Sequence, residues 1–347
     1  MRMTIRAALC LAALAATVLG ASAYGASSTS TASGSVADVS GSSSSAGSKK
    51  LTIAFVMGAG ADPFFKAMRV GAEREAAAKG VNLIWQGDPS VYSPATQIPI
   101  LDQVLAQKPS GLVLIPTDPN ALQSGVNKAT AAGIPVVNVD THVADLSHVL
   151  SFITGNNQDG GAKAADIIAK AIGYQPGHTY QVVVGMSSPA STTNVDRLKG
   201  FSDEIKARYP GIEIVDKGYS QSQPAVANTN VNNWLTKYPN LSGIFAIDGT
   251  NATGAAAALQ AKGVVGKIKL VAYDAYPANV ALMKQGVFTA LIAQRPAAEA
   301  KLAIDDLVRY LRGGHSTAGI QKRVTLLNVV LTKDTAPDVL KKYTYVQ

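Results

Sequence analysis

The sequence predicts an α/β protein with two similar, doubly wound parallel-sheet domains. From residue 51 to residue 331, short apolar stretches alternate with longer amphipathic stretches, a pattern typical of parallel strands covered by helices on both faces. About ten such strands are more than one open sheet usually holds. A chain of 347 residues is also long enough for two domains of ordinary size, so we expect two sheets.

The two halves of the chain resemble each other, which supports this division. The segment 111–118 in the first half matches 243–248 in the second, and 134–140 matches 268–274. In each segment an apolar strand is followed by an aspartate. Such a repeat fits two domains of similar fold.

The elements follow from apolar periodicity and from turn residues. The first strand is expected at 51–57 and the first helix at 63–79, where Gly80 ends it. The remaining strands are expected at 81–85, 111–115, 135–139, 149–154, 181–185, 212–215, 243–247, 268–273 and 289–293, with a last pair within 324–331. The remaining helices are expected at 96–107, 120–132, 160–172, 195–208, 225–237, 252–262, 278–285 and 297–312.

The N-terminus predicts export. Arg2 and Arg6 precede an apolar run at 7–19, and Ala21-Ser22-Ala23 forms a small-residue cleavage site, so residues 1–23 are interpreted as a signal peptide. The run is shorter than the roughly 20 residues that a spanning helix needs. Residues 24–50 are rich in Ser, Thr, Gly and Ala, and we expect a disordered leader there.

Composition and missing motifs exclude several function classes. The one cysteine, Cys10, lies in the predicted signal peptide, and the four histidines lack the spacing of a metal site, so no metal is predicted. Dinucleotide-binding and phosphate-binding glycine motifs and the G-x-S-x-G elbow are absent, and no cofactor is predicted. The excess of 31 Lys and Arg over 23 Asp and Glu is spread along the chain, which argues against nucleic-acid binding.

Polar residues follow several predicted strands. Asp62, Asp140, Asp248, Asp274 and Gln294 each lie just past a strand end. Ligands of open α/β sheets bind outside the carboxyl ends of the strands. A carboxylate accepts two hydrogen bonds well, and adjacent hydroxyls of a sugar or polyol supply two donors.

Local roles compete with ligand binding for the acids. Asp62 precedes Pro63 and suits a helix N-cap as well as a ligand contact. Asp248 has the same two interpretations, and Asp118 is better explained as a cap. Asp140 and Asp274 are less easily explained in this way, and we expect the carboxylate of Asp274 to lie in an open, wet cleft without a buried partner.

The aromatic and basic candidates are also ambiguous. Phe64 and Phe65 point about 100° apart on a helix, so one of them can face a crevice. Trp85 and Trp234 are better explained as core residues. Spacing alone favours a solvated helix charge for Arg197.

An ordered set of short motifs resembles the ribose-binding protein family, periplasmic solute-binding proteins that feed sugar ABC importers. The motifs lie in order between residues 51 and 331. They are Asp62-Pro63-Phe64-Phe65, Pro116-Thr117-Asp118, Gly133-Ile134-Pro135-Val136-Val137, Asp140, Asn157, Gly160-Gly161, Arg197-x-x-Gly200-Phe201, Asp248, Tyr273-Asp274 and Ala293-Gln294.

The resemblance implies two lobes joined by three crossing segments, the type I periplasmic binding protein fold. It places an N-terminal lobe at 51–155 plus 295–327 and a C-terminal lobe at 156–294 plus 328–347. It also implies that the ligand lies in the cleft between the lobes. The ligand-binding residues would be Asp62, Phe64, Phe65, Asp140, Arg197, Asp248, Asp274 and Gln294, with the two phenylalanines against the sugar ring.

Two positions depart from the family pattern. Thr141 replaces the arginine that commonly follows the first-lobe aspartate, which removes one cation from the cleft. The aromatic residue that is usual near 219–223 is represented here only by Tyr219. Four carboxylates against one arginine favour a neutral ligand rich in donors.

The sequence therefore predicts a monomeric periplasmic protein, not an enzyme, that captures a neutral monosaccharide or polyol for a membrane permease. One alternative is the branch that binds autoinducer-2, which the loop 88–91 loosely resembles. A secreted carbohydrate-active enzyme with paired carboxylates is a further alternative. A helix-turn-helix of the kind found in related transcription regulators is absent.

Overall fold

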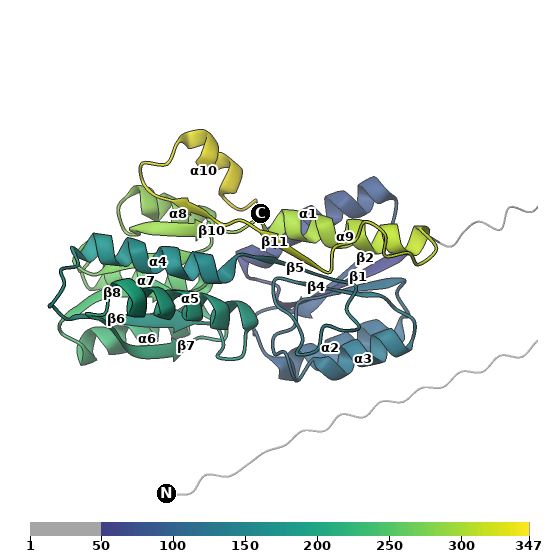
Figure 1. Cartoon of the computed structure of the whole chain (residues 1–347), viewed down its shortest axis with the longest axis horizontal. Helices are drawn as coiled ribbons and strands as arrows, with labels where there is room; N and C mark the ends of the chain where they lie inside the picture. Colours follow the sequence, from purple (N-terminus) through teal and green to yellow (C-terminus); the bar gives the residue numbers. More distant parts are fainter. Residues whose placement is uncertain (1–49, 347) are drawn as a thin grey trace, which may run out of the picture. The chain divides into compact units, whose positions relative to one another are not determined.

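The computed structural model describes residues 50–346 (Figure 1). The predicted signal peptide and all but the last residue of the predicted leader lie outside the described residues. The described chain forms two six-stranded sheets, one in each half of the molecule. We call the part built on the first sheet the N-terminal lobe and the part built on the second sheet the C-terminal lobe.

The first sheet is entirely parallel and has the strand order β11-β5-β4-β3-β1-β2. The second has the order β12-β10-β9-β8-β6-β7, and only β12 runs antiparallel to its neighbour. The strands are β1 (Thr52–Ala59), β2 (Asn82–Asp88), β3 (Gly111–Leu114), β4 (Val136–Val139), β5 (Ser151–Gly155), β6 (Tyr180–Met186), β7 (Ile212–Tyr219), β8 (Leu241–Ala246), β9 (Lys269–Tyr273), β10 (Ala290–Ala293), β11 (Arg323–Leu326) and β12 (Val329–Leu331).

Both sheets are wound in the same way. Read along the chain, the first five strands of each sheet are arranged in the order 2-1-3-4-5, a doubly wound topology. The chain crosses between the sheets three times, between β5 and α4, between β10 and α9, and between β11 and β12. The predicted fold class of two similar doubly wound domains is therefore confirmed.

Helices cover both faces of each sheet (Figure 1). On the first sheet, Ile53 and Phe55 belong to the apolar core on one face, and Ala54 and Val56 to the core on the other, because successive strand residues alternate in direction. The helices are α1 (Pro63–Lys79), α2 (Pro94–Ala106), α3 (Gln123–Ala131), α4 (Asn157–Ile172), α5 (Thr192–Arg208), α6 (Pro224–Lys237), α7 (Gly249–Ala261), α8 (Pro277–Lys284), α9 (Pro296–Arg312) and α10 (Pro337–Tyr343).

Small residues allow two helix pairs to pack closely. A Cβ atom on Gly71 of α1 would lie 2.3 Å from the carbonyl oxygen of Ala297 in α9. A Cβ atom on Gly161 of α4 would lie 2.0 Å from the carbonyl oxygen of Arg197 in α5. Only glycine fits at either position, and the second contact fixes the backbone of the helix that carries Arg197.

The last two strands, predicted within 324–331, lie in different sheets. β11 joins the first sheet and β12 the second. The third crossing separates them at Leu327 and Asn328. Helix α10 was not predicted. Among the described helices, none is both long enough and apolar enough to cross a membrane.

The two tryptophans pack with the apolar core, as predicted, Trp234 as a buried residue and Trp85 as a partly buried one. Trp85 stacks on Phe55 with ring centroids 4.5 Å apart, and Trp234 is buried against the second sheet.

Candidate functional site

One pocket between the two lobes collects all eight residues that the sequence singled out. Its lining consists of residues at the carboxyl ends of the strands of both sheets, where α/β proteins bind ligands. The lining residues are Asp62, Phe64, Phe65, Tyr92, Asp140, Ser187, Ser191, Thr193, Asn194, Arg197, Ser222, Asp248, Asp274 and Gln294.

The beginning of α1 supplies an acid and two aromatic rings to the pocket. Asp62 is the N-cap of this helix, and its Oδ1 accepts from the backbone N–H of Phe64 at 2.9 Å. The rings of Phe64 and Phe65 meet edge to face at 5.3 Å, and both are buried. Burial raises the pKa of Asp62 to about 7. Asp62 therefore has both roles between which the sequence could not decide, N-cap and pocket residue.

Asp140 presents an unused acceptor. It follows β4 directly, and its backbone lies in the left-handed region at φ 60°, which is uncommon for a residue other than glycine. Its side chain is only 9% exposed, and Oδ1 has no hydrogen-bond partner within residues 50–346. Burial raises its pKa to about 7, although Arg197 opposes this rise.

Arg197 faces Asp140 from the other lobe. Its Nε donates to Oδ1 of Asn157 at 2.8 Å, Nη1 donates to the carbonyl oxygen of Ile247 at 2.9 Å, and the guanidinium lies 3.9 Å from the ring centroid of Tyr273. Nη2 is buried without a partner in the described part of the chain, 4.0 Å from Oδ1 of Asp140. Spacing alone favoured a solvated charge for Arg197. The structure contradicts this because the residue is 2% exposed.

Asp274 is held much more tightly than Asp140. It follows β9 at φ 73°, and its oxygens accept from Gly249 N–H, the amide of Gln294 and the hydroxyl of Tyr345, each at 2.8 Å. Burial raises its pKa, and the charge of Arg197 and the bonds from Gln294 and Tyr345 oppose the rise. From the sequence we expected Asp274 to lie in an open, wet cleft and to hold no buried partner. That expectation is wrong, because three donors depend on this carboxylate.

Asp248 has a structural role at the pocket rim. It is the N-cap of α7, where its Oδ1 accepts from Asn251 N–H at 2.9 Å and from the hydroxyl of Thr250 at 2.7 Å. Asp118 is not part of the pocket lining. Its Oδ1 accepts from two backbone N–H groups of the turn before α3. It therefore caps this turn and not the helix, whose N-cap residue is Leu122.

Sequence reasoning missed six lining residues. Ser187 and Ser191 lie in the loop after β6, Thr193 and Asn194 in the first turn of α5, and Ser222 in the loop after β7. These small polar residues carry no distinctive spacing, and Tyr92 lies in the loop after β2. The six are Tyr92, Ser187, Ser191, Thr193, Asn194 and Ser222. Their one shared signal is position, since each follows the end of a strand.

The two departures from the family pattern have clear outcomes. The hydroxyl of Thr141 donates to the carbonyl oxygen of Pro116 at 2.7 Å, so Thr141 points away from the pocket lining. Tyr219 is 44% exposed and does not line the pocket, so the aromatic rings of the described lining come from Phe64, Phe65 and Tyr92.

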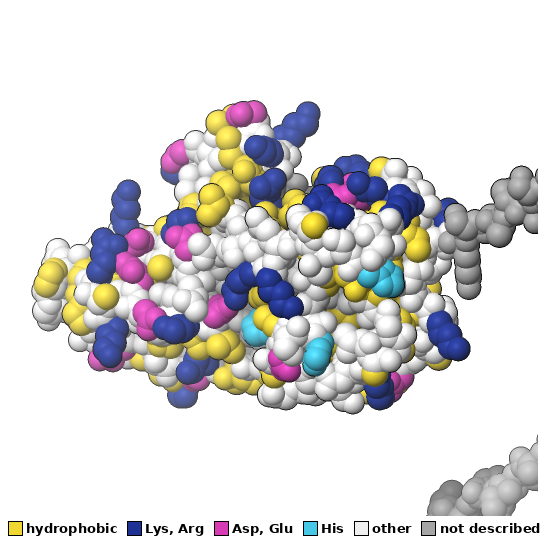
Figure 2. Space-filling model, turned by 45° about the vertical axis from the view of Figure 1, so that its right-hand side comes forward, with side chains coloured by type: hydrophobic (Ala, Val, Ile, Leu, Met, Phe, Trp, Pro, Cys, Tyr) yellow, Lys and Arg dark blue, Asp and Glu magenta, His cyan; other side chains and the backbone are white. Residues whose placement is uncertain are grey.

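Charge outside the pocket is mixed. On the face drawn in Figure 2, basic and acidic side chains are interspersed, and no single basic stripe runs across it. Within residues 50–346, no group of three or more His, Cys, Asp or Glu side chains is arranged to hold a metal ion.

Two doubly wound lobes, three crossings and a polar pocket between the lobes define a periplasmic binding protein. The chain belongs to this family: the model described as "periplasmic binding protein domain" matches residues 53–315. The resemblance found in the sequence is thereby confirmed.

The sequence is similar to those of known sugar-binding proteins. The ribose import binding protein of Salmonella typhimurium is 30% identical over 263 residues, which cover 74% of this chain and 84% of that protein. The D-ribose/D-allose-binding protein of Pseudomonas aeruginosa is 29% identical over 273 residues, 76% of this chain and 83% of that protein.

The fold is also similar to those of solute-binding proteins whose structures were solved with bound sugars. A solute-binding protein of an ABC transporter from Agrobacterium vitis, bound with α-D-tagatopyranose, is 31% identical with a TM-score of 0.80, over 86% of this chain and all of that one. A solute-binding protein from Actinobacillus succinogenes with bound D-allose is 27% identical with a TM-score of 0.73, over 85% of this chain and 100% of that one. These relatives are transport proteins, not enzymes.

Proposed function

We propose that this protein captures a neutral monosaccharide or polyol between its two lobes and delivers it to the permease of an ABC importer. The pair formed by Asp140 Oδ1 and Arg197 Nη2 is the observation that carries the proposal. One atom is an acceptor and the other a donor, both are buried, and they face each other from opposite lobes at 4.0 Å.

A sugar hydroxyl matches this pair because it donates one hydrogen bond and accepts others. A buried donor or acceptor without a partner costs about 1–3 kcal/mol, so a hydroxyl that satisfies both atoms at once stabilises the closed arrangement. The ligand would thus favour closure, because it contacts both lobes only when they are closed.

The charge of the lining favours a neutral ligand. Asp62, Asp140, Asp248 and Asp274 surround one arginine, and Thr141 supplies no second cation. A sugar acid or sugar phosphate would meet this excess of carboxyl groups. The rings of Phe64 and Phe65 offer apolar surface for the face of a sugar ring.

We propose lobe boundaries at 51–155 plus 295–327 and 156–294 plus 328–347, which agree with the sheet in which each strand lies. We further propose that residues 1–23 direct export and are removed, that 24–50 form a leader, and that the mature monomer works in the periplasm. Export would leave Tyr24 near the N-terminus. N-terminal sequencing of protein from the extracytoplasmic fraction tests this, and an intact Met1 would contradict it.

A thermal-shift screen tests the ligand class. The panel contains the monosaccharides named for the relatives, D-ribose, D-allose, D-tagatose and D-arabinose, together with polyols, D-gluconate and ribose 5-phosphate. A ligand at about 100 times its Kd stabilises the native state by about 2.7 kcal/mol, which should raise Tm by roughly 5 °C or more. A shift with a neutral member supports the proposal, and shifts only with the acids would contradict it.

A further inference from the structure

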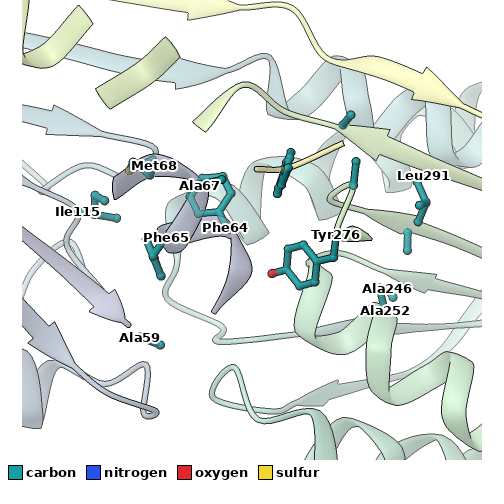
Figure 3. Close-up of a cluster of buried hydrophobic side chains, with 14 of the residues drawn as sticks. Ala59, Phe64, Phe65, Ala67, Met68, Ile115, Ala246, Ala252, Tyr276 and Leu291 are labelled. Carbon is teal, nitrogen blue, oxygen red and sulfur yellow. The ribbon is translucent and has the colours of Figure 1, made fainter. Parts of the chain in front are cut away.

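An aromatic cluster lies next to the pocket and includes one of its lining residues, Phe64. The ring of Tyr345 lies 6.2 Å from that of Phe64 and 5.9 Å from that of Tyr276. Figure 3 shows the Tyr276 hydroxyl turned toward the beginning of α1, the helix that carries Phe64. Phe64 belongs to the N-terminal lobe, whereas both tyrosines belong to the C-terminal lobe, so the cluster spans the cleft.

Tyr276 makes a polar contact across the cleft. It is the N-cap residue of α8, two positions after Asp274, and it is 3% exposed. Its hydroxyl donates to Oδ1 of Asp62 in the other lobe. Its ring is fixed by close packing against α7, since a Cβ atom on Gly249 would lie 2.1 Å from it. Tyr276 itself does not line the pocket.

We propose that Tyr276 is a positioning residue that latches the two lobes together through Asp62. The inference deepens the proposed function, since it rests on lobes that hinge around a ligand. The bond joins two protein groups, so it forms on closure whether or not a sugar is bound. It occupies one oxygen of Asp62 and leaves Oδ2, which accepts no hydrogen bond within residues 50–346, for a ligand hydroxyl.

Two weaker contacts across the cleft accompany this bond. Tyr92 N–H donates to the carbonyl oxygen of Gln221 at 3.3 Å, and His142 N–H donates to the hydroxyl of Thr192 at 3.3 Å. Both are neutral and long. The Tyr276 bond has a carboxylate acceptor, and such bonds are roughly twice as strong as neutral ones. Its removal should therefore shift the balance of open and closed forms by roughly 10- to 100-fold.

Tyr345 provides a matched control. Its hydroxyl also donates to a pocket carboxylate, Oδ1 of Asp274, and it is also buried. Both partners of that bond lie in the C-terminal lobe, so its loss changes no contact between lobes. Tyr276→Phe and Tyr345→Phe thus remove the same atom from the same cluster. The bonds lost in Tyr345→Phe, to Asp274 and from the backbone N–H of Gln294, stay within one lobe, whereas the bond lost in Tyr276→Phe crosses the cleft.

The test measures the distance between the lobes without sugar. The exported protein lacks Cys10, so Asn127→Cys on α3 and Asn233→Cys on α6 supply its two labelling sites for a fluorophore pair. Both positions are exposed, one in each lobe. We expect a short-distance population in the parent protein that falls by roughly 10-fold or more in Tyr276→Phe and is unchanged in Tyr345→Phe. Asp62→Asn keeps an acceptor for the tyrosine and should give an intermediate population.

Equal distance distributions in the parent and in Tyr276→Phe would overturn the latch. So would an equal loss in the two tyrosine variants, which would indicate a structural role for the cluster. If Tyr276→Phe does not fold, as judged by its melting curve, Asp62→Asn against the parent decides alone, and an unchanged distance overturns the proposal. Because no sugar is present, these outcomes are independent of the ligand screen, so failure of the latch and failure of the proposed function remain distinguishable.

Discussion

Asp140 and Asp274 occupy equivalent positions in the two lobes and differ in what holds them. Each follows the fourth strand of its sheet at positive φ, and each backbone N–H donates to the next strand, to Ile153 and Ile292 respectively. The carboxylate of Asp274 accepts three hydrogen bonds from the protein, whereas the carboxylate of Asp140 accepts none within residues 50–346. The same local structure thus supports an acid that holds its lobe together and an acid that is available to a ligand.

The largest expected effect is the destabilisation caused by Asp274→Asn. Asparagine tolerates the left-handed backbone, so the change isolates the loss of acceptors. Its amide N–H₂ must face at least one of three donors, and each stranded buried donor costs about 1–3 kcal/mol. We expect the free energy of unfolding without ligand to fall by at least about 1–3 kcal/mol, as measured by urea denaturation. A loss below about 1 kcal/mol would show that the three bonds do not hold the lobe.

The matched change, Asp140→Asn, should act on affinity instead. The carboxylate of Asp140 holds no protein donor, so the unliganded stability should change by less than about 1 kcal/mol. A charged hydrogen bond to a sugar hydroxyl contributes roughly 1.5–3 kcal/mol, so Kd should rise by about 10- to 100-fold. Calorimetric titration with the sugar identified in the screen measures this. If Asp140→Asn destabilises the fold as much as Asp274→Asn does, the contrast between the two acids is wrong.

Tyr345→Phe sharpens the account of Asp274. It removes one of the three donors, keeps the ring against Phe64, and leaves a carboxylate oxygen with the remaining bond from Gln294. We expect a smaller stability loss than for Asp274→Asn, about 1–2 kcal/mol. Thermal melting of both variants shows which of the two loses more stability. A larger loss in Tyr345→Phe would mean that the C-terminal segment stabilises the lobe by another route.

The smallest expected effect is a proton linked to binding. Asp62 and Asp140 have pKa values raised to about 7, so each is partly protonated near neutral pH. A ligand hydroxyl that donates to the ionised carboxylate lowers this pKa, and binding at pH 7 should release a fraction of a proton. Calorimetry in two buffers of different ionisation enthalpy detects the release. It should shrink in Asp140→Asn, and proton uptake on binding would contradict the account.

The same shifts set the pH dependence of the unliganded fold. Both acids bind protons more tightly in the folded state than in the unfolded state, where their pKa is near 3.8. The native state therefore binds more protons between about pH 4 and 7, and the stability contributed by these protons is lost as pH rises through that window. Chemical denaturation should therefore give a larger contribution of these acids to the free energy of unfolding at pH 5 than at pH 7.5. Salt-bridged acids would give the opposite order.

Local pattern was sufficient for the fold class and for the strand-end positions of Asp62, Asp140, Asp248, Asp274 and Gln294. Phe64, Phe65 and Arg197 were implied only by the family resemblance, and all eight residues line one pocket. Apolar stretches of strand length alternate with helical ones, and a residue just past a parallel strand lies at the pocket edge whatever its neighbours are. The partners of those residues could not be found in this way. Tyr345 lies 71 positions from Asp274, and Tyr276 lies 214 positions from Asp62. Only the packed lobes bring such pairs together.

The claim that one ligand hydroxyl bridges the two lobes is tested most directly by a double-mutant cycle on sugar affinity. The cycle combines Asp140→Asn with Arg197→Lys, which keeps the positive charge but removes the placed Nη2. If a hydroxyl contacts both atoms, either single change breaks the bridge, and the two losses should fall short of additivity by about 0.5–3 kcal/mol. Strictly additive losses would place the two residues on separate parts of the ligand and would contradict the bridge.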